Sequence, residues 1–192
     1  MRRIAHILLP AALLLLGSMT AEGQTFLAGT FQSPKGMGLT AMLDTDQGRE
    51  TNILTIRTDF YGVLSGRTPE IGAFLCYTHD YIFFRREAEN YDMLLHAGAG
   101  SMLGYAHDFE KGIFSSFDRE LDRNAGGVLA LVGNAGVRFD FRRRLSLDIS
   151  FSAAPGLHLR SDPETGAWLL SFYKNGCYRA YFPQINLMYR FK

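Results

Sequence analysis

The sequence predicts an all-β fold: an eight-stranded antiparallel up-and-down transmembrane β-barrel that follows an N-terminal signal peptide. Three observations lead to this fold class. The chain begins with a secretory signal, its remainder divides into eight segments in which apolar and polar residues alternate, and the polar faces of those segments carry acidic and basic residues together. We therefore divide the chain into a cleaved signal peptide, residues 1–23, and a single barrel domain, residues 24–192.

The first two dozen residues have the pattern of a secretory signal peptide. Arg2 and Arg3 supply its positive start, and an apolar stretch of 11 residues follows at Ile7–Gly17. This stretch is shorter than the roughly 20 residues that a membrane-spanning helix needs. Ala21-Glu22-Gly23 supplies a small-residue cleavage site, so we expect Gln24 at the mature N-terminus. A retained N-terminal anchor is the alternative.

The composition of the remaining chain excludes some classes of function. Removal of 23 residues from the 192-residue chain leaves 169, and its 20 basic and 19 acidic residues become 18 of each. A neutral chain without a basic excess argues against a nucleic-acid binder. Cys76 and Cys177 are the only cysteines; they are able to pair in an oxidising compartment, but two cysteines do not form a disulfide framework.

Four alternating segments come first, and we place them at residues 25–32, 37–45, 52–64 and 70–84. The first two have the weakest alternation. The third sets Leu54 and Ile56 against Thr55 and Arg57. The fourth is ambiguous, because His79 falls on its more apolar face, and this indicates either an interfacial residue or a β-bulge.

Four further segments follow at residues 91–105, 129–141, 145–160 and 182–192. The seventh has the cleanest pattern, since leucines, Ile149 and Phe151 share one face and serines, Asp148 and His158 share the other. In the eighth, the sequence INLMYRF alternates to within one residue of the chain's last position. Gly98, Gly100 and Gly104 share the polar face of the fifth, where they leave either a groove or room for long arginine side chains.

The connections between segments alternate in length, which indicates the topology. Those at 46–50, 87–90 and 142–144 are short, whereas those at 107–125 and 161–177 are long. Transmembrane barrels have short periplasmic turns and longer outside loops. This pattern predicts that both termini lie in the periplasm, although the connections at 33–36 and 65–69 are short for outside loops.

Strand length and aromatic placement predict that the apolar faces meet lipid. The fifth and seventh segments keep their alternation for about 15 residues, whereas strands of globular proteins usually run for about 5–6. Aromatic residues of the apolar faces gather at the expected periplasmic strand ends, as an interfacial girdle requires. They are Phe83, Tyr91, Phe139, Phe141, Tyr189 and Phe191. The alternative is that these are ordinary core aromatics.

The polar faces predict a lumen filled with paired charges. An eight-stranded barrel has an interior only wide enough for side chains, and buried charges must be paired to be tolerated. The residues that we expect there are Arg57, Asp59, Asp80, Asp92, His96, Arg138, Asp140, Asp148, His158, Arg160 and Arg190. We expect Arg190 to pair with an aspartate such as Asp92 or Asp140.

The signal peptide, the eight segments and the terminal INLMYRF together resemble small bacterial outer-membrane β-barrels of the OmpX and OmpA transmembrane-domain type. The resemblance covers nearly the whole mature chain and implies an outer-membrane location. It also implies that Ile185, Leu187, Tyr189 and Phe191 form the signal that the barrel-assembly machinery recognises. Lys192 after the final Phe departs from that pattern. The activity stays open, because such barrels include adhesins, enzymes and assembly partners.

We expect a non-enzymatic role, without cofactor or metal, as a structural or interaction component of the envelope. His96 and His158 lie on different strands and have no local ligand spacing. The outside loops carry apolar residues that suit contact with another envelope protein: Phe109, Phe114, Phe117 and Trp168. One alternative is a lipid-modifying enzyme that uses His107, Asp108, Ser115 and Ser116. Another is a soluble periplasmic barrel that binds a small ligand.

Overall fold

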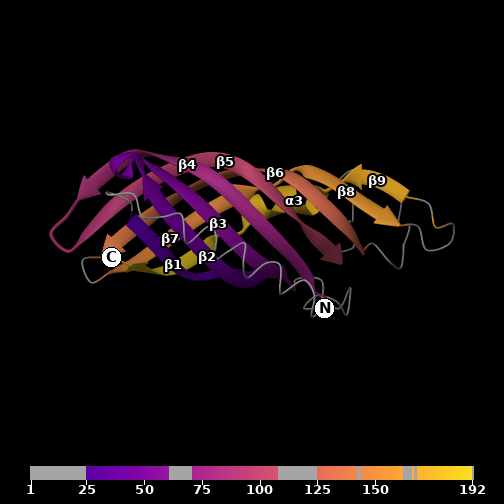
Figure 1. Ribbon diagram of the computed structural model, residues 1–192, viewed down its shortest axis with the longest axis horizontal. Helices are drawn as coiled ribbons and strands as arrows, with labels where there is room; N and C mark the ends of the chain where they lie inside the picture. Colours follow the sequence, from indigo (N-terminus) through magenta and orange to yellow (C-terminus); the bar gives the residue numbers. More distant parts are fainter. Residues whose placement is uncertain are drawn as a thin grey trace.

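The computed structural model describes residues 25–60, 71–107, 125–141, 144–161, 166 and 168–191. Most of them lie in β-strands (Figure 1). The strands are β1 (Thr25–Ser33), β2 (Gly36–Thr45), β3 (Glu50–Asp59), β4 (Gly72–Glu87), β5 (Tyr91–His107), β6 (Ala125–Phe141), β7 (Leu145–Ala153), β8 (Gly156–Ser161), β9 (Trp168–Phe172) and β10 (Gln184–Phe191). The described residues also form three short helices: η1 (Asp46–Gly48), α3 (Lys174–Tyr178) and η2 (Arg179–Tyr181). Among the described residues, none of the helices has the length and apolar character to traverse a bilayer.

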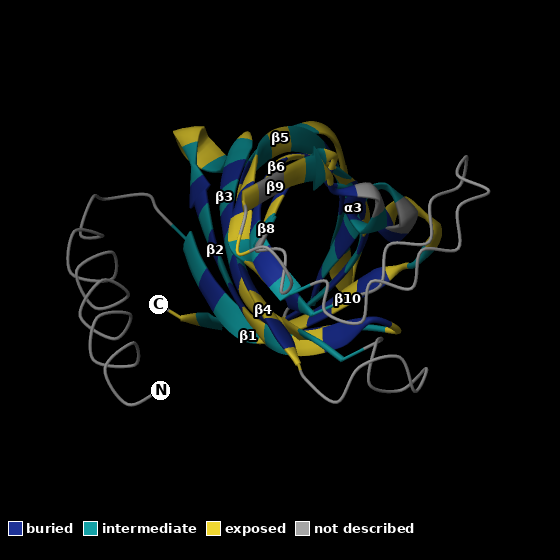
Figure 2. Ribbon diagram, turned by 90° about the vertical axis from the view of Figure 1, so that its right-hand side faces the viewer, coloured by how far each residue is buried: buried dark blue, intermediate teal, exposed yellow. Residues whose placement is uncertain are grey.

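The strands close into a barrel. Each strand from β1 to β6 pairs antiparallel with the next, and β10 pairs with both β7 and β1. β7 and β8 both pair with β6 and so share one position in the wall, while β9 and β10 share the next. The ten strands therefore occupy eight positions, and the end-on view shows them as a ring (Figure 2). This confirms the predicted fold class, an eight-stranded antiparallel barrel.

The two ends of the barrel differ, and we name each by its connections. The turn end holds η1, the β4–β5 turn and Phe191. The loop end holds the β1–β2 turn, the end of β3 at Asp59, the end of β8 at Ser161 and the start of β9 at Trp168. At the turn end the chain reverses tightly: the Ala88 amide donates to the Tyr91 carbonyl oxygen, and Asp46, Gln47 and Gly48 all have positive φ.

Two strand positions are interrupted, which the alternation did not predict. The segment expected at 145–160 is divided at Pro155, which has no N–H to donate to a neighbouring strand. The eighth position is divided by α3 and η2, which lie between β9 and β10 at the end of the long connection predicted at 161–177. The two interruptions meet, because the Ala154 amide donates to the Gly176 carbonyl oxygen (3.0 Å). A Cβ at Gly176 would collide with the Ala154 backbone, so this close approach requires glycine.

The two faces of the wall follow the predicted alternation. Buried and exposed residues alternate along β4, β6 and β10 (Figure 2). A β-bulge interrupts β4 between Ile82 and Phe84 and turns both Phe83 and Phe84 outward. His79 lies three residues before this bulge on the outer face, where its Nδ1 contacts the Asn52 side-chain oxygen (2.9 Å).

Glycine residues on β5 allow the backbone of β4 to approach closely. Side chains at Gly98 and Gly100 would collide with the backbone of β4, at His79 and Tyr77 respectively. These glycines therefore allow close approach of two strands, rather than leaving a groove or space for arginines across the lumen.

Candidate functional site

Many ionisable side chains lie in the lumen. Those at the turn end form a connected ionic cluster. Arg138 donates from Nη1 and Nη2 to the two Asp44 oxygens (2.8 and 2.7 Å), across the barrel from β6 to β2. Its Nε lies 3.3 Å from Asp140, which also pairs with Arg190 (2.7 Å). The Ser146 hydroxyl donates to Asp140 as well (2.7 Å). Such bidentate, multiply bonded charges satisfy the condition for burial.

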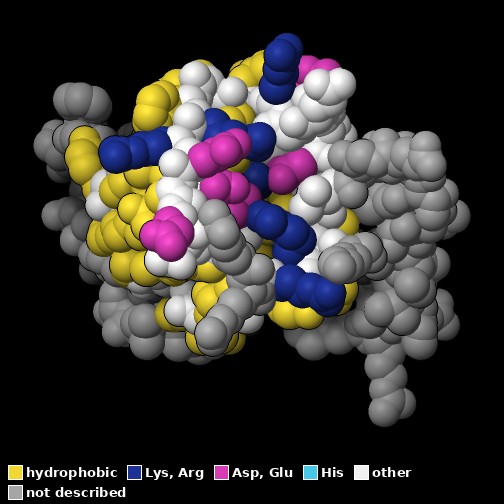
Figure 3. All heavy atoms as spheres, turned by 90° about the vertical axis from the view of Figure 1, so that its left-hand side faces the viewer, with side chains coloured by type: hydrophobic (Ala, Val, Ile, Leu, Met, Phe, Trp, Pro, Cys, Tyr) yellow, Lys and Arg dark blue, Asp and Glu magenta, His cyan; other side chains and the backbone are white. Residues whose placement is uncertain are grey.

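Charged side chains also fill the mouth of the barrel at this end. In the end-on view, acidic and basic side chains lie intermingled over the centre, with hydrophobic side chains beside them (Figure 3). Arg190 is the part of the cluster that reaches water, since its side chain is 33% exposed while that of Arg138 is 2% exposed. The remaining predicted residue of this end, Asp92, is half-buried.

A second layer, centred on His96, lies next along the strands. The His96 Nδ1 is 2.7 Å from Asp80, and its Nε2 is 2.8 Å from Asp148. An imidazole can donate from both nitrogens only when it is doubly protonated. His96, Asp80 and Asp148 together therefore hold one proton more than a neutral imidazole and two ionised carboxylates would hold. Asn134 donates to Asp80 and Asn186 donates to Asp148, each at 2.7 Å.

A small cavity of about 20 Å³ follows this layer. Arg57, Thr78, Ser152, Gln184 and Asn186 are among the residues that line it. This volume is close to the space that a single water molecule needs. The Gln184 amide donates to the Ser152 hydroxyl across one side of it.

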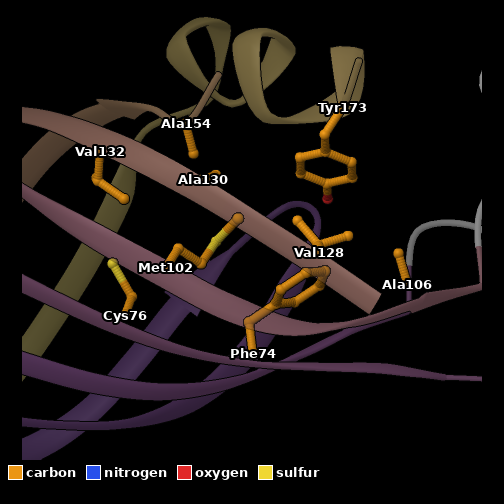
Figure 4. Close-up of a cluster of buried hydrophobic side chains, with 9 residues drawn as sticks. All are labelled: Phe74, Cys76, Met102, Ala106, Val128, Ala130, Val132, Ala154 and Tyr173. Atoms are coloured by element: carbon orange, nitrogen blue, oxygen red, sulfur yellow. The ribbon is translucent and has the colours of Figure 1, made fainter. Parts of the chain in front are cut away.

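The loop-end half of the interior contains a cluster of buried apolar side chains beside the buried Arg57, His158 and Arg179. The sequence predicted polar residues in the lumen but not this apolar cluster. The cluster consists of Phe74, Cys76, Met102, Ala106, Val128, Ala130, Val132, Ala154 and Tyr173. Tyr173 projects from the start of α3 toward Val128 and Phe74 (Figure 4). Its ring centroid lies 6.2 Å from that of Phe74 and 6.0 Å from that of His158, which is fully buried.

One ion pair links α3 and η2 to the barrel wall above this apolar cluster. Arg179 of η2 donates to Asp59 at the end of β3 (2.7 Å), and its guanidinium stacks 5.0 Å from the Phe74 ring centroid. Arg57 is also buried here, where its Nη2 donates to the Met102 sulfur (3.0 Å). Arg160 is half-buried and donates to the Ser171 hydroxyl (2.9 Å).

The predicted lumen residues therefore fall into separate groups along the barrel axis. Asp140, Arg138 and Arg190 lie at the turn end, Asp80, His96 and Asp148 lie in the next layer, and the remaining residues other than Asp92 lie toward the loop end. His96 and His158 are in different groups. The described part of the chain contains no cluster of three or more histidine, cysteine or carboxylate side chains that is arranged to hold a metal ion.

Sequence reasoning missed Asp44 and Arg179, the partners of two central ion pairs. Asp44 shares the inward phase of Thr40 on β2, but Met42 between them is apolar and weakens that signal. Arg179 lies outside any alternating segment, so no periodic signal marks it. Both cysteines are free thiols, Cys76 buried and Cys177 half-buried.

The other predicted site residues lie on the wall or outside the described residues. Ile185, Leu187, Tyr189 and Phe191 all face outward, each between 41% and 48% exposed. Trp168 also faces outward, on β9, and His107 ends β5 with its ring 4.9 Å from that of Tyr105. The signal-peptide residues 1–23 and the loop residues Asp108, Phe109, Phe114, Ser115, Ser116 and Phe117 lie outside the described residues.

Two solved structures of other proteins are similar to this chain in fold. The chain is similar to the N-terminal β-barrel domain of Pseudomonas aeruginosa OprF, with a TM-score of 0.52 and 10% identity over 88% of this chain and 98% of that one. The chain has the fold of a small outer-membrane β-barrel. It is also similar to a major outer membrane protein from Thermus thermophilus, with a TM-score of 0.49 and 12% identity over 88% of this chain and 100% of that one.

No family model and no curated protein sequence matches the chain. The likeness to outer-membrane barrels therefore rests on the fold. It agrees with the fold that the resemblance in the sequence implied.

Proposed function

We propose that the protein is a non-enzymatic integral outer-membrane β-barrel with a sealed lumen, which acts as a structural or interaction component of the envelope through its extracellular loops. The observation that carries this proposal is the inverted distribution of polarity. Large apolar side chains cover the outside of the barrel, and the paired charges lie inside it.

The outer face is unsuited to water. Exposed apolar side chains occur on every strand position from β2 to β10; Leu131 is 74% exposed, Leu39 66% and Leu187 46%. Soluble monomers rarely expose a contiguous apolar patch larger than a few hundred Å². A closed barrel, in contrast, satisfies its backbone hydrogen bonds internally and meets the main requirement for crossing hydrocarbon. Lipid is thus the solvent that fits this face.

Aromatic contacts at the turn end support its placement at the periplasmic interface. The Phe191 ring lies 5.6 Å from Phe26 and 5.2 Å from Tyr189, and Tyr91 lies 6.0 Å from Phe139. Such girdles mark the interfaces of transmembrane barrels. We propose that the outward residues of β10, which end in Phe191, are also what the barrel-assembly machinery recognises.

The contents of the lumen support a sealed barrel. The ionic cluster occupies the turn end, the His96 layer follows, and the apolar cluster around Tyr173 fills the loop end. Eight-stranded barrels have room for side chains alone, unlike the wide barrels that form aqueous channels. We expect purified protein in planar bilayers to show no stepwise conductance; a steady unitary conductance would contradict the sealed lumen.

We place the interaction surface in the loops at the loop end. Trp168 is 72% exposed on β9, and Leu170 on the same face is 64% exposed. The sequence between β5 and β6 adds the apolar residues Phe109, Phe114 and Phe117, and exposed apolar residues of this kind suit contact with another envelope protein. Crosslinking in intact cells followed by purification of the detergent-extracted protein tests this role: a defined crosslinked partner supports it, and a chain that stays uncrosslinked contradicts it.

Cell fractionation tests the location. We expect the protein in the carbonate-resistant outer-membrane fraction, with faster gel migration before heating than after, as a folded barrel in detergent shows. Release into the soluble periplasm would support the ligand-binding alternative instead. For the enzymatic alternative, the test is the lipid A profile of a strain that lacks the gene; we expect it to be unchanged.

A further inference from the structure

His96 is a buried histidine whose two ring nitrogens both contact carboxylates. Its side chain is 3% exposed, and those of Asp80 and Asp148 are 0% and 1% exposed. Each N···O contact, at 2.7 and 2.8 Å, is a hydrogen bond only if a proton lies between the two atoms. A neutral imidazole has one N–H, and an ionised carboxylate has no proton to donate. The second contact therefore requires one further bound proton.

The other contacts of the two carboxylates indicate where this proton lies. Asn134 donates to the same Asp80 oxygen that the imidazole contacts, at 2.7 Å. Asn186 and Ser150 donate to the second oxygen of Asp148, at 2.7 and 3.3 Å. Both carboxylates thus accept hydrogen bonds, as ionised carboxylates do, and an imidazole is the more basic group. The additional proton therefore lies on the imidazole.

The charges of this part of the lumen balance only while the proton is bound. With it, His96, Asp80 and Asp148 together carry one negative charge. The buried Arg57 lines the same cavity as Asp148 and carries one positive charge. Without the proton, two carboxylates and a neutral ring would share the interior with one guanidinium. An unbalanced buried charge is strongly unfavourable, so proton release destabilises the folded barrel.

The remaining charged groups near the layer are balanced among themselves. Arg138 of β6 interacts electrostatically with Asp148, but its bidentate hydrogen bonds go to Asp44 of β2. Asp140 of β6 pairs with Arg190 of β10. These two guanidinium groups and two aspartates form the neutral ionic cluster of the turn end. They supply no net charge that would replace the proton on the imidazole.

The wall fits closely around the imidazole. Gly136 of β6 is paired with His96 on one side and with Ser150 on the other. A Cβ at Gly136 would lie 2.8 Å from the His96 Nε2 and 2.7 Å from the Ser150 Cβ, so this approach requires glycine. The hydrogen bonds of the layer connect β4, β5, β6, β7 and β10. The loss of one proton therefore affects five strands together.

We propose that the His96 layer is a proton-binding site, and that its proton is a structural ligand that makes the stability of the barrel depend on pH. Release of the proton breaks one of the two contacts between the imidazole and a carboxylate, and it leaves a negative charge unbalanced in the lumen. The folded barrel is therefore more stable at neutral than at alkaline pH. This inference goes beyond the proposed envelope role and does not depend on it, because lumen residues alone form the layer.

The pH dependence of unfolding tests the proposal. Between about pH 7.5 and 9, a histidine of the unfolded chain is neutral, because its ordinary pKa is about 6.5. The folded layer then holds one proton more than the unfolded chain, so stability falls as the pH rises. For one proton, the unfolding equilibrium constant rises about tenfold per pH unit. Urea titration of the full mature chain in lipid vesicles, followed by Trp168 fluorescence, measures this constant.

Asp148→Asn isolates the contribution of the proton. Its amide nitrogen can donate to the imidazole, while its oxygen keeps the hydrogen bonds from Asn186 and Ser150. The imidazole is then neutral and donates to Asp80, so the layer keeps its single negative charge opposite Arg57. We expect this variant to lose the tenfold rise per pH unit. An equal pH dependence in the wild type and in Asp148→Asn would overturn the proposal.

His79→Gln is the matched control, because His79 lies on the outer face and contacts Asn52 there. We expect this variant to keep the pH dependence of the wild type. Loss of the dependence in His79→Gln would assign the proton to the outer face and would contradict a site in the lumen.

Nitrogen NMR detects the proton directly and needs no variant. The full mature chain is labelled with ¹⁵N-histidine and studied in detergent micelles at about pH 8, where an ordinary histidine is neutral. We expect both ring nitrogens of His96 to carry protons at this pH. A His96 ring with one unprotonated nitrogen would overturn the proposal, whatever the variants show.

Discussion

The two halves of the lumen are filled by opposite means. At the turn end, Arg138 bonds Asp44 through both terminal nitrogens and joins Asp140 and Arg190 in one cluster. A smaller apolar group, Leu27, Met42, Ile53 and Met188, packs beside it. At the loop end, apolar side chains dominate, and the centre is filled by Tyr173, which comes from an interruption of the wall rather than from a regular strand.

The difference shows that closing the barrel wall and filling the barrel interior impose separate requirements on the sequence. Wherever regular strands supply inward side chains from all sides, charges can meet partners across the narrow interior. Toward the loop end, β1, β2 and β10 are short while β4, β5 and β6 are long. The wall there lacks inward side chains on one side, and the segment from Tyr173 to Tyr181 supplies the missing contacts. The charged half should therefore depend on exact pairing, and the apolar half on volume.

Arg138→Met should have the largest effect on stability. The change leaves Asp44 without its bidentate partner in a buried site, and we expect a loss of about 3–5 kcal/mol in the free energy of unfolding. Urea titration of the protein in lipid vesicles, followed by Trp168 fluorescence, measures it. Adding Asp44→Leu to the variant should restore part of the stability. A loss that the second substitution does not reduce would contradict pairing as the cause.

Tyr173→Ala should have the next largest effect. Removing this ring leaves a void among Phe74, Val128 and Ala154, and we expect a loss of roughly 3 kcal/mol in the same titration. Tyr173→Phe keeps the volume and is the matched control, with most of the stability retained. If the two variants were equally unstable, polar contacts of the hydroxyl, rather than volume, would govern the loop-end half.

Ser146→Ala should have a smaller effect in the charged half. The fully buried hydroxyl donates to Asp140 at 2.7 Å, and its removal leaves that carboxylate one donor short. We expect a loss of about 1–2 kcal/mol. Thr58→Ala, which removes an exposed hydroxyl bonded to the Met37 carbonyl oxygen, is the comparison and should change little. Equal losses would remove the distinction between the buried cluster and the surface.

Arg190→Gln should have the smallest effect. Arg190 pairs with Asp140 at the mouth, where a third of its side chain meets solvent, and Asp140 keeps Ser146 and Arg138 as partners. Screening by water limits the expected loss to about 0–1 kcal/mol. A loss as large as that of Arg138→Met would show that the mouth is sealed from water.

Much of the architecture was predictable, because the two faces of each strand meet different solvents. Leu187 and Asn186 are neighbours in sequence, yet they lie on opposite sides of the wall, as a period of two requires. The same alternation assigned Arg138, Asp148 and His96 to the interior. Gly126–Val132, in contrast, is apolar on both faces, and this was an available signal that the loop-end interior is apolar.

The partners inside the barrel were not predictable, because they depend on closure. Arg138 and Asp44 are 94 residues apart and meet only when β2 and β6 stand on opposite sides of the lumen. The helix at Lys174–Tyr178 likewise depends on a distant contact, between Gly176 and Ala154. Local alternation contains no information about either contact. The ion pairs inside the barrel and the helix that fills its loop end therefore depend on tertiary structure.

The central claim is that the exposed apolar face contacts lipid, and one fluorescence measurement tests it directly. Trp168 is the only tryptophan, so Leu187→Trp in a Trp168→Phe background places a single reporter on the outer face of β10. The matched control is Arg86→Trp, at the exposed end of β4. In vesicles of brominated phospholipid, we expect strong quenching at position 187, little effect of aqueous acrylamide there, and the reverse at position 86. Acrylamide quenching at position 187 without quenching by the brominated lipid would contradict a barrel in the membrane.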